Sequence, residues 1–170
     1  MMEALNVVKS LNLPDWWLAA GFVRNKVWDS LHEYPKRTEG AAIDVDVVYF
    51  DPQILSAEAE KEIELNLFLA KPGVPWSVTN QARMWEENGD APYLNSIDAI
   101  TRWPETATCV GVKLNDQNKL ELAAPLGLDD VIRMILRPNK LCRRNTSVFY
   151  DRLHKKNWLR KWPRVKVAYE

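Results

Sequence analysis

The segment from Ala42 to Asp51, AIDVDVVYFD, most constrains what this chain can fold into. Val, Ile, Tyr and Phe favour an extended, half-buried backbone, so the segment is predicted to form a β-strand. Side chains two positions apart leave a strand on the same face. Asp44 and Asp46 are therefore expected to point to one face, while the aliphatic residues beside them pack against the other.

Two acidic side chains on one face of a strand repel each other. Their Cα atoms would lie about 6.6 Å apart, where two unit charges repel by roughly 2.5 kcal/mol at an effective dielectric constant of about 20. One interpretation is the solvated face of an edge strand, where acids discourage edge-to-edge pairing. The other is a divalent-cation site, because Mg²⁺ prefers carboxylate oxygens and completes its shell with water and substrate phosphates.

The residues upstream favour the cation site. Trp16 to Ala20 reads as a short apolar strand, and Gly21 follows it immediately before a predicted helix over 23–33. A strand, a glycine and a helix in this order aim free backbone N–H groups at an anion. Gly21 would let a phosphate approach the backbone closely, and Arg24 could bind its oxygens with a planar guanidinium.

These motifs carry a resemblance to a known superfamily. Ala-Gly-Phe-Val-Arg-Asn at 20–25, followed by Asp44-Val45-Asp46, resembles the DNA polymerase beta nucleotidyltransferase superfamily, and is closest to the Gly-Gly-x-Val-Arg-Asp element of CCA-adding tRNA nucleotidyltransferases. Over nearly its whole length the chain resembles a bacterial family of predicted nucleotidyltransferases. The blocks that carry this resemblance are 19–25 with Trp28, 44–51, 76–84, 103–108 and 124–130.

The resemblance implies an α+β fold of the polymerase-beta type, with a mixed β-sheet flanked by helices. It implies an enzyme that moves a nucleoside monophosphate from a nucleoside triphosphate to a hydroxyl of an acceptor and releases pyrophosphate. Mg²⁺ or Mn²⁺ would be held by Asp44 and Asp46, which are the expected catalytic residues. The nucleotide phosphates would be bound by Gly21, Phe22, Arg24 and Asn25.

Two departures from the superfamily pattern keep an alternative open. Phe22 is bulky where many members have Gly or Ser, and the third strand, expected over Trp76 to Asn80, has no carboxylate. Glu105 or Glu121 is a candidate for the missing acid, from a neighbouring strand. The alternative function is a non-catalytic nucleotide- or RNA-binding module, and a phosphohydrolase using the same metal is a third possibility.

The segment after the third strand has two interpretations. Asn80, Gln81 and Arg83 supply donors suited to a ribose, a base edge or a phosphate, and Trp85 could stack on a base. A short capped helix in which Arg83 pairs with Glu87 explains the same residues without a ligand.

Charge is unevenly distributed along the chain. Residues 131–170 contain twelve Lys or Arg residues against two acidic ones, although the net charge of the whole chain is zero. This asymmetry indicates a polyanionic partner, RNA or a triphosphate, near the C-terminus. A helix predicted over Ser147 to Lys161 interleaves these cations with aromatics, which could equally pack inward while the lysines point to solvent.

The length of 170 residues predicts a single nucleotidyltransferase-like domain, with a basic helical extension over 138–170. Two Cys and two His residues are too few for a disulfide framework or a Cys/His metal cluster. No apolar run approaches the roughly 18 residues of a membrane span, and the N-terminus lacks a signal-peptide pattern. We therefore expect a cytoplasmic protein without a membrane partner. Further helices are predicted over 2–12, 56–70, 95–102 and from 127, and a hairpin over 106–114 and 119–124.

Overall fold

The computed structural model describes residues 1–35, 44–143 and 147–169. The first two residues of the strand predicted over 42–51 therefore lie outside the described residues, and its described part forms β2 (Val45–Tyr49). Among the helices of the described ranges, none is long and apolar enough to cross a membrane.

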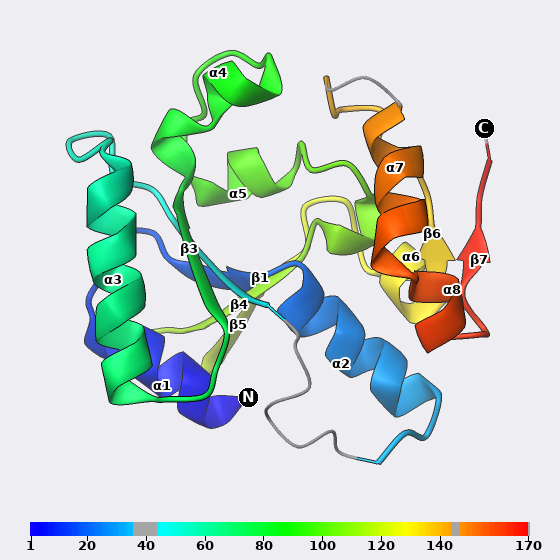
Figure 1. Ribbon diagram of the computed structural model, residues 1–170, viewed down its shortest axis with the longest axis horizontal. Coiled ribbons are helices and arrows are strands. Elements are labelled where there is room, and N and C mark those ends of the chain that lie inside the picture. Colours follow the sequence, from blue (N-terminus) through cyan, green and yellow to red (C-terminus); the bar gives the residue numbers. More distant parts are fainter. Residues whose placement is uncertain (36–43, 144–146, 170) are drawn as a thin grey trace.

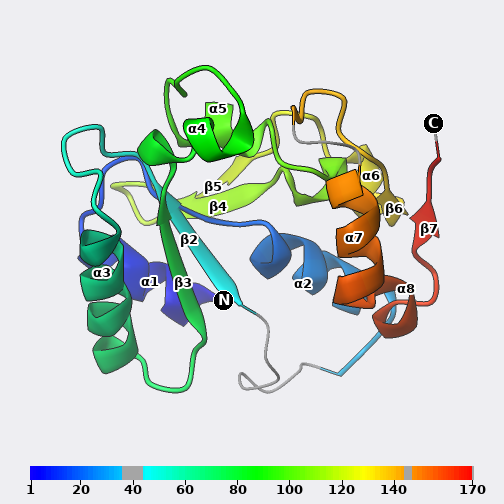
Figure 2. The same ribbon diagram turned by 45° about the horizontal axis from the view of Figure 1, so that its top comes forward.

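A five-stranded mixed sheet forms the centre of the molecule (Figures 1 and 2). Its order is β3-β2-β1-β4-β5, with β1 (Trp17–Ala19), β3 (Trp76–Asn80), β4 (Gly111–Leu114) and β5 (Leu120–Ala123). β2 and β3 are parallel, and every other neighbouring pair is antiparallel. The predicted α+β architecture with a mixed sheet is thus confirmed.

Helices cover the two faces of the sheet unequally. On one face, Leu18, Val47 and Val78 belong to a large core with residues of α1 (Met2–Ser10), α2 (Gly21–Leu31) and α3 (Ala57–Ala70). The other face has a smaller cluster in which Trp17 and Val48 meet Ile100 of the short helix α5 (Ser96–Ile100). Side chains two positions apart on a strand share a face, so Asp46 lies on the same face as Val48, which is the face with the smaller cluster.

The remaining elements are short and connect the sheet to the C-terminal segment. Residues predicted to begin a strand at Thr106 instead form a 3-10 turn, in which Thr108 donates its backbone N–H to the carbonyl of Glu105 at 2.9 Å. The helix predicted over 147–161 is divided at Asn157, whose φ of 51° is left-handed. These elements are η1 (Gln81–Arg83), α4 (Trp85–Asn88), η2 (Thr106–Thr108), α6 (Asp129–Ile132), β6 (Ile135–Leu136), α7 (Ser147–Lys156), α8 (Trp158–Lys161) and β7 (Lys166–Val167).

The basic C-terminal segment packs into the main core. Trp162 meets the ring of Trp28 on α2 edge-on at a centroid distance of 5.4 Å, and its indole N–H donates to Asp29 at 2.8 Å. β7 pairs in parallel with β6. α7 itself has Phe149 in this core, and its Lys156 lies 4.0 Å from Asp44, the residue before β2.

Candidate active site

The pairing of β1 with β2 brings the start of α2 next to the two aspartates. Ala19 lies opposite Asp46 in the antiparallel register, and α2 begins two residues later at Gly21. Asp44 precedes β2 by one residue and lines the same pocket as Asp46. The strand alternation inferred from sequence thus agrees with the geometry, and both carboxylates face the glycine-started helix.

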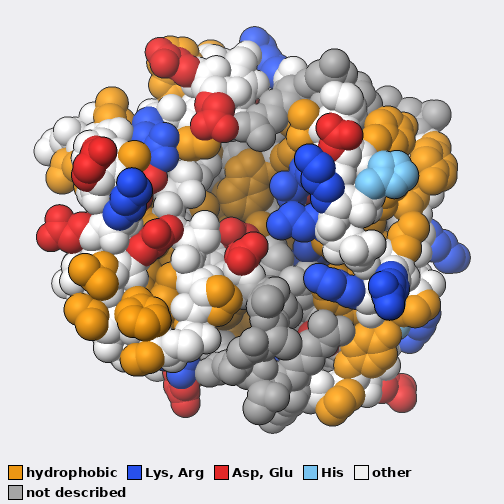
Figure 3. Space-filling model, viewed as in Figure 1, with side chains coloured by type: hydrophobic (Ala, Val, Ile, Leu, Met, Phe, Trp, Pro, Cys, Tyr) orange, Lys and Arg blue, Asp and Glu red, His pale blue; other side chains and the backbone are white. Residues whose placement is uncertain are grey.

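The pocket has two adjoining parts, and Figure 3 shows it as a hollow beside a column of Lys and Arg side chains. Both parts contain Ala20, Asp44, Asp46, Thr108, Arg152 and Lys156. The smaller part, about 100 Å³, is the basic arm, and it is lined further by Gly21, Arg24, Asn25, Trp158 and Lys161. The larger part, about 260 Å³, is the neutral arm, and it is lined further by Ser77, Thr79, Gln81, Met84, Arg102 and Trp103.

The two aspartates differ in their exposure to solvent. The Asp44 side chain is 67% exposed, and its Oδ2 lies 4.0 Å from Nζ of Lys156. Burial, followed by the charge of Asp44, raises the pKa of Asp46 to about 6, against opposing effects of nearby cations. An ionised Asp46 is therefore costly in the protein alone, and a bound cation would remove that cost.

Arg152 and Lys156 lie one helical turn apart on α7 and both line the two arms. Arg152 is held by Glu105, with 2.5 Å between its Nε and the carboxylate Oε1. The charge distribution along the sequence indicates a basic C-terminus but does not place these two side chains beside the aspartates. The i,i+4 spacing was visible, but nothing in the sequence linked it to the acidic strand.

Arg24 is positioned by aromatic rings. Its guanidinium is stacked between Trp28 and Trp158, with centroid distances of 5.1 and 4.8 Å, and its Nη2 donates to Oδ1 of Asn25 at 2.9 Å. Burial lowers the pKa of Arg24 to about 10, so it remains a cation at neutral pH. Phe22, predicted to bind phosphate, has its side chain packed against the main core instead.

The backbone at the start of α2 is strained. Ala20 has φ 51° and ψ −119°, which is rare for a residue with a side chain, and its N–H donates to Val110 of the neighbouring loop at 2.9 Å. A Cβ added at Gly21 would lie 3.3 Å from Nδ2 of Asn25. The glycine therefore leaves open the space in front of the first N–H groups of the helix.

The candidate third carboxylates lie elsewhere, and both predictions are wrong. Glu105 is fully buried and ion-paired with Arg152, so its oxygens are already used. Glu121 lies on β5, which β1 and β4 separate from β2, and it pairs with Lys113 at 3.5 Å. The residue beside Asp46 on β3 is Ser77.

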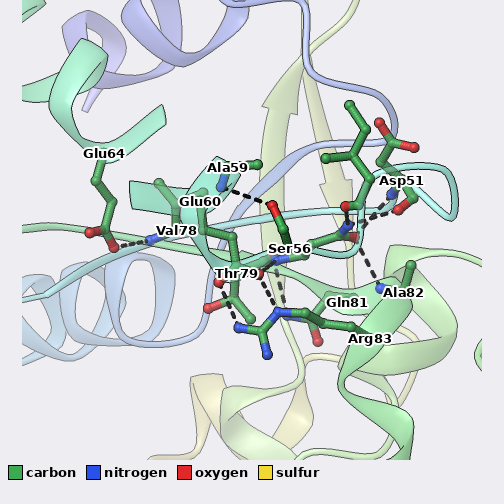
Figure 4. Close-up of polar contacts among 12 residues, drawn as sticks. Asp51, Ser56, Ala59, Glu60, Glu64, Val78, Thr79, Gln81, Ala82 and Arg83 are labelled. Carbon is green, nitrogen blue, oxygen red and sulfur yellow. Dashed lines mark hydrogen bonds and ion pairs between the residues drawn. The ribbon is translucent and has the colours of Figure 1, made fainter. Parts of the chain in front are cut away.

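Asn80 and Arg83, predicted as ligand contacts, have structural roles, and Figure 4 shows Arg83 facing Glu60. Oδ1 of Asn80 accepts hydrogen bonds from the N–H groups of Asp51 and Ala82 at 3.0 and 3.1 Å. Arg83 forms a two-fold ion pair with Glu60 of α3, at 2.7 and 2.6 Å. Neither side chain lines the pocket, because both tie the end of β3 to α3 and to the loop before it.

The donor set around Asp46 fits Mg²⁺. Within the described parts of the chain, no group of three or more His, Cys, Asp or Glu side chains is placed to hold a metal ion. Mg²⁺ is nevertheless bound in many proteins by one or two carboxylates, with water and substrate phosphates completing its octahedron. Asp44 and Asp46, with the hydroxyl-bearing Ser77 beside them, meet that requirement.

Comparison with known proteins agrees with this geometry. A family model described as nucleotidyltransferase matches residues 6–167. The chain belongs to this nucleotidyltransferase family. The nucleotidyltransferase is similar to a protein whose NMR structure was described as revealing a CCA-adding enzyme head domain. The two are 34% identical, the match covers 99% of this chain and 89% of that one, and the TM-score is 0.88.

Larger enzymes share the fold at lower identity. A CCA-adding enzyme in complex with CTP is 16% identical with a TM-score of 0.55, and an apo tRNA-processing enzyme is 14% identical with a TM-score of 0.57. These two matches cover 99% and 98% of this chain. They cover only 39% and 42% of the larger enzymes, so the chain spans less than half of their length. No curated protein matches the chain.

Proposed function

We propose that this nucleotidyltransferase moves a nucleoside monophosphate from a nucleoside triphosphate to a hydroxyl of an acceptor, in a reaction that depends on Mg²⁺ or Mn²⁺. The observation that carries the proposal is the shared pocket of Asp44, Asp46, the N-terminus of α2 and two cations of α7. Phosphoryl transfer needs mainly positioning and charge stabilisation, and this pocket supplies both.

Asp44 and Asp46 would hold the metal ion, which when bound neutralises phosphate charge and lowers the pKa of the acceptor hydroxyl. Gly21 at the start of α2 lines the basic arm, where the first N–H groups of the helix would donate to oxygens of the β- and γ-phosphates. Arg152 and Lys156 would stabilise the charge that develops on the departing pyrophosphate. Arg24, fixed between its two tryptophans, adds a cation that needs no reorganisation.

The acceptor is proposed to be RNA or another polyanion. Exposed cations follow the outer side of the C-terminal helices next to the pocket, including Lys155, Arg160 and Lys161. A basic surface of this kind binds phosphate backbones. The structural neighbours include CCA-adding enzymes in complex with CTP and with ATP, which supports a nucleoside triphosphate as the donor, and a tRNA-processing enzyme, which is consistent with an RNA acceptor.

The geometry gives no support to the alternative of a non-catalytic binding module. That alternative was motivated by Phe22 and by the neutral third strand. The Phe22 side chain packs against the main core and does not line the basic arm, so its size is compatible with phosphates bound there. Because the β3 residue beside Asp46 is Ser77, the site has two carboxylates, Asp44 and Asp46. Two carboxylates suffice for a cation that also binds substrate phosphates.

Transfer of a labelled nucleotide tests the proposal. Wild-type protein is incubated with labelled nucleoside triphosphates, Mg²⁺ and candidate RNA acceptors, and both labelled product and pyrophosphate are measured. Asp44→Ala is expected to lower the rate by at least about a hundredfold, because it removes a metal ligand worth several kcal/mol. Asp116→Ala, in the exposed β4–β5 turn, is the matched control. Equal rates for wild type and Asp44→Ala would end the assignment.

Gly21→Ala is expected to weaken nucleotide binding without loss of the fold. The new methyl group would lie 3.3 Å from Nδ2 of Asn25 and 3.8 Å from Nη2 of Arg24, in the space assigned to the phosphates. We expect KM for the nucleoside triphosphate to rise by about tenfold, a cost of about 1.4 kcal/mol, while thermal stability is kept because alanine is the better helix former.

Ser30→Ala, an exposed position on the same helix, is the control for that comparison. Steady-state kinetics and thermal denaturation of both variants give the answer. An unchanged KM in Gly21→Ala would show that phosphates do not approach this end of α2.

A further inference from the structure

The neutral arm adds one charged side chain to those that it shares with the basic arm. This is Arg102, whose guanidinium faces Asp98 at 3.2 Å and Asp90 at 3.9 Å. Thr79 and Gln81 line one side, and Met84 and Trp103 add apolar surface. Figure 3 shows hydrophobic side chains at the bottom of the hollow. Such a lining suits an uncharged, flat group better than a phosphate.

Gln81 is a buried polar side chain with unused hydrogen-bonding capacity in this arm. It is 4% exposed, and its Nε2 donates to the carbonyl of Thr79 at 3.5 Å, the outer limit for such a bond. Its Oε1 accepts no hydrogen bond from any residue that the structure describes. Since Oε1 is not among the buried side-chain atoms that lack a partner, it is open to the pocket, where a ligand that offers both a donor and an acceptor can bind the amide.

The position of the arm relative to the aspartates indicates which ligand group enters it. On the proposed function, the β- and γ-phosphates occupy the basic arm and the α-phosphate lies at Asp44 and Asp46. The nucleoside is bonded directly to the α-phosphate, so it must occupy the space next to the aspartates on the side away from pyrophosphate. The neutral arm is that space, and its volume of about 260 Å³ accommodates one nucleoside.

We infer that the neutral arm binds the nucleoside of the incoming nucleotide. Gln81 hydrogen-bonds the edge of the base, while Trp103 and Met84 contact its face. Amide side chains are well suited to base edges, because they present a donor and an acceptor side by side. This inference rests on the proposed function, and it leaves the exposed side of Asp44 for the acceptor.

Comparing the affinity for nucleotides with the affinity for inorganic triphosphate distinguishes the roles of the two arms. Affinities of wild type and Gln81→Met for ATP, CTP, GTP, UTP and inorganic triphosphate are measured by calorimetry with Mg²⁺. The substitution keeps the side-chain length and removes both hydrogen-bonding atoms. We expect at least one nucleotide to bind about tenfold more weakly, while inorganic triphosphate, which has no nucleoside, binds with unchanged affinity. Gln117→Met, in the exposed β4–β5 turn, is the control.

A second variant addresses the apolar contact. Trp103→Leu is expected to weaken nucleotide binding about fivefold to tenfold and again to spare inorganic triphosphate. Trp85→Leu, a half-buried tryptophan outside the pocket lining, serves as its control.

Three outcomes would overturn the inference. Unchanged nucleotide affinity in both variants would show that the nucleoside lies elsewhere, and a raised KM for the acceptor alone would assign the arm to the acceptor. Equal loss of nucleotide and inorganic triphosphate affinity would show general damage to the site. Failure of the wild type to bind any of these ligands would instead refute the proposed function itself.

Discussion

Asp46→Asn is expected to abolish nucleotidyl transfer and, above pH 6, to stabilise the metal-free protein. The two effects have one cause, which is a carboxylate placed where only a bound cation makes its charge favourable. Burial and Asp44 raise the pKa of Asp46 to about 6, above the value of about 3.9 for an unfolded chain. The stability that Asp46 contributes is therefore fully present below pH 4 and is lost as the pH rises through 6.

Denaturant unfolding with a chelator, between pH 4 and 8, measures this effect. The free energy of unfolding of Asp46→Asn minus that of wild type should increase from pH 4 to 6 and then level off at about 3 kcal/mol, because a shift of about two pKa units corresponds to about 1.4 kcal/mol per unit. Added Mg²⁺ should stabilise wild type selectively and reduce the difference, since it binds the folded protein alone. The rate of transfer should fall by about a thousandfold or more.

Asp116→Asn, an exposed substitution of the same kind, should change neither stability nor rate. A variant Asp46→Asn that is less stable than wild type at pH 7.5 would contradict the electrostatic account. One that retains its rate would contradict the catalytic role of this carboxylate.

Local patterns in the sequence were sufficient to predict the arrangement around Asp46. Alternation along a strand put Asp44 and Asp46 on one face, and the order of strand, glycine and helix put Gly21 at a helix start. Both depend on neighbours within a few residues. The bounds of β3 also agree with the prediction, since Trp76 to Asn80 forms the expected short strand with a turn after it.

The sequence could not identify which polar residues the fold uses for its own stability. Asn80 and Arg83 follow a strand at the position where ligand contacts are common, yet Arg83 reaches back 23 residues to Glu60. Arg152 reaches 47 residues to Glu105. Pairings over such distances depend on how α3 and α7 pack, which no local spacing encodes. Gln81, immediately after Asn80, is the member of this segment that lines the pocket.

The ion pair of Arg152 with Glu105 is expected to be a large contributor to stability. Glu105 is fully buried and also accepts a hydrogen bond from Thr108 at 3.1 Å. Arg152→Met removes the charge and keeps most of the side-chain length, so Glu105 would remain as an unpaired charge in the interior. Breaking a buried pair in this way costs about 3–5 kcal/mol, and the loss of a pocket cation should also lower the rate of transfer.

A double-mutant cycle with Glu105→Gln separates this pairing from the other contacts of Arg152, such as its approach to Trp158 at 5.9 Å. Because Glu105→Gln removes the charge that Arg152→Met leaves unpaired, the double variant should be about 2 kcal/mol more stable than the sum of the single effects. Arg133→Met is the matched control, since Arg133 pairs with Asp129 on the exposed side of α6 and such pairs contribute less than about 1 kcal/mol. If Arg152→Met were no more destabilising than Arg133→Met, Glu105 would not depend on Arg152, and α7 would be held in place by its aromatic contacts alone.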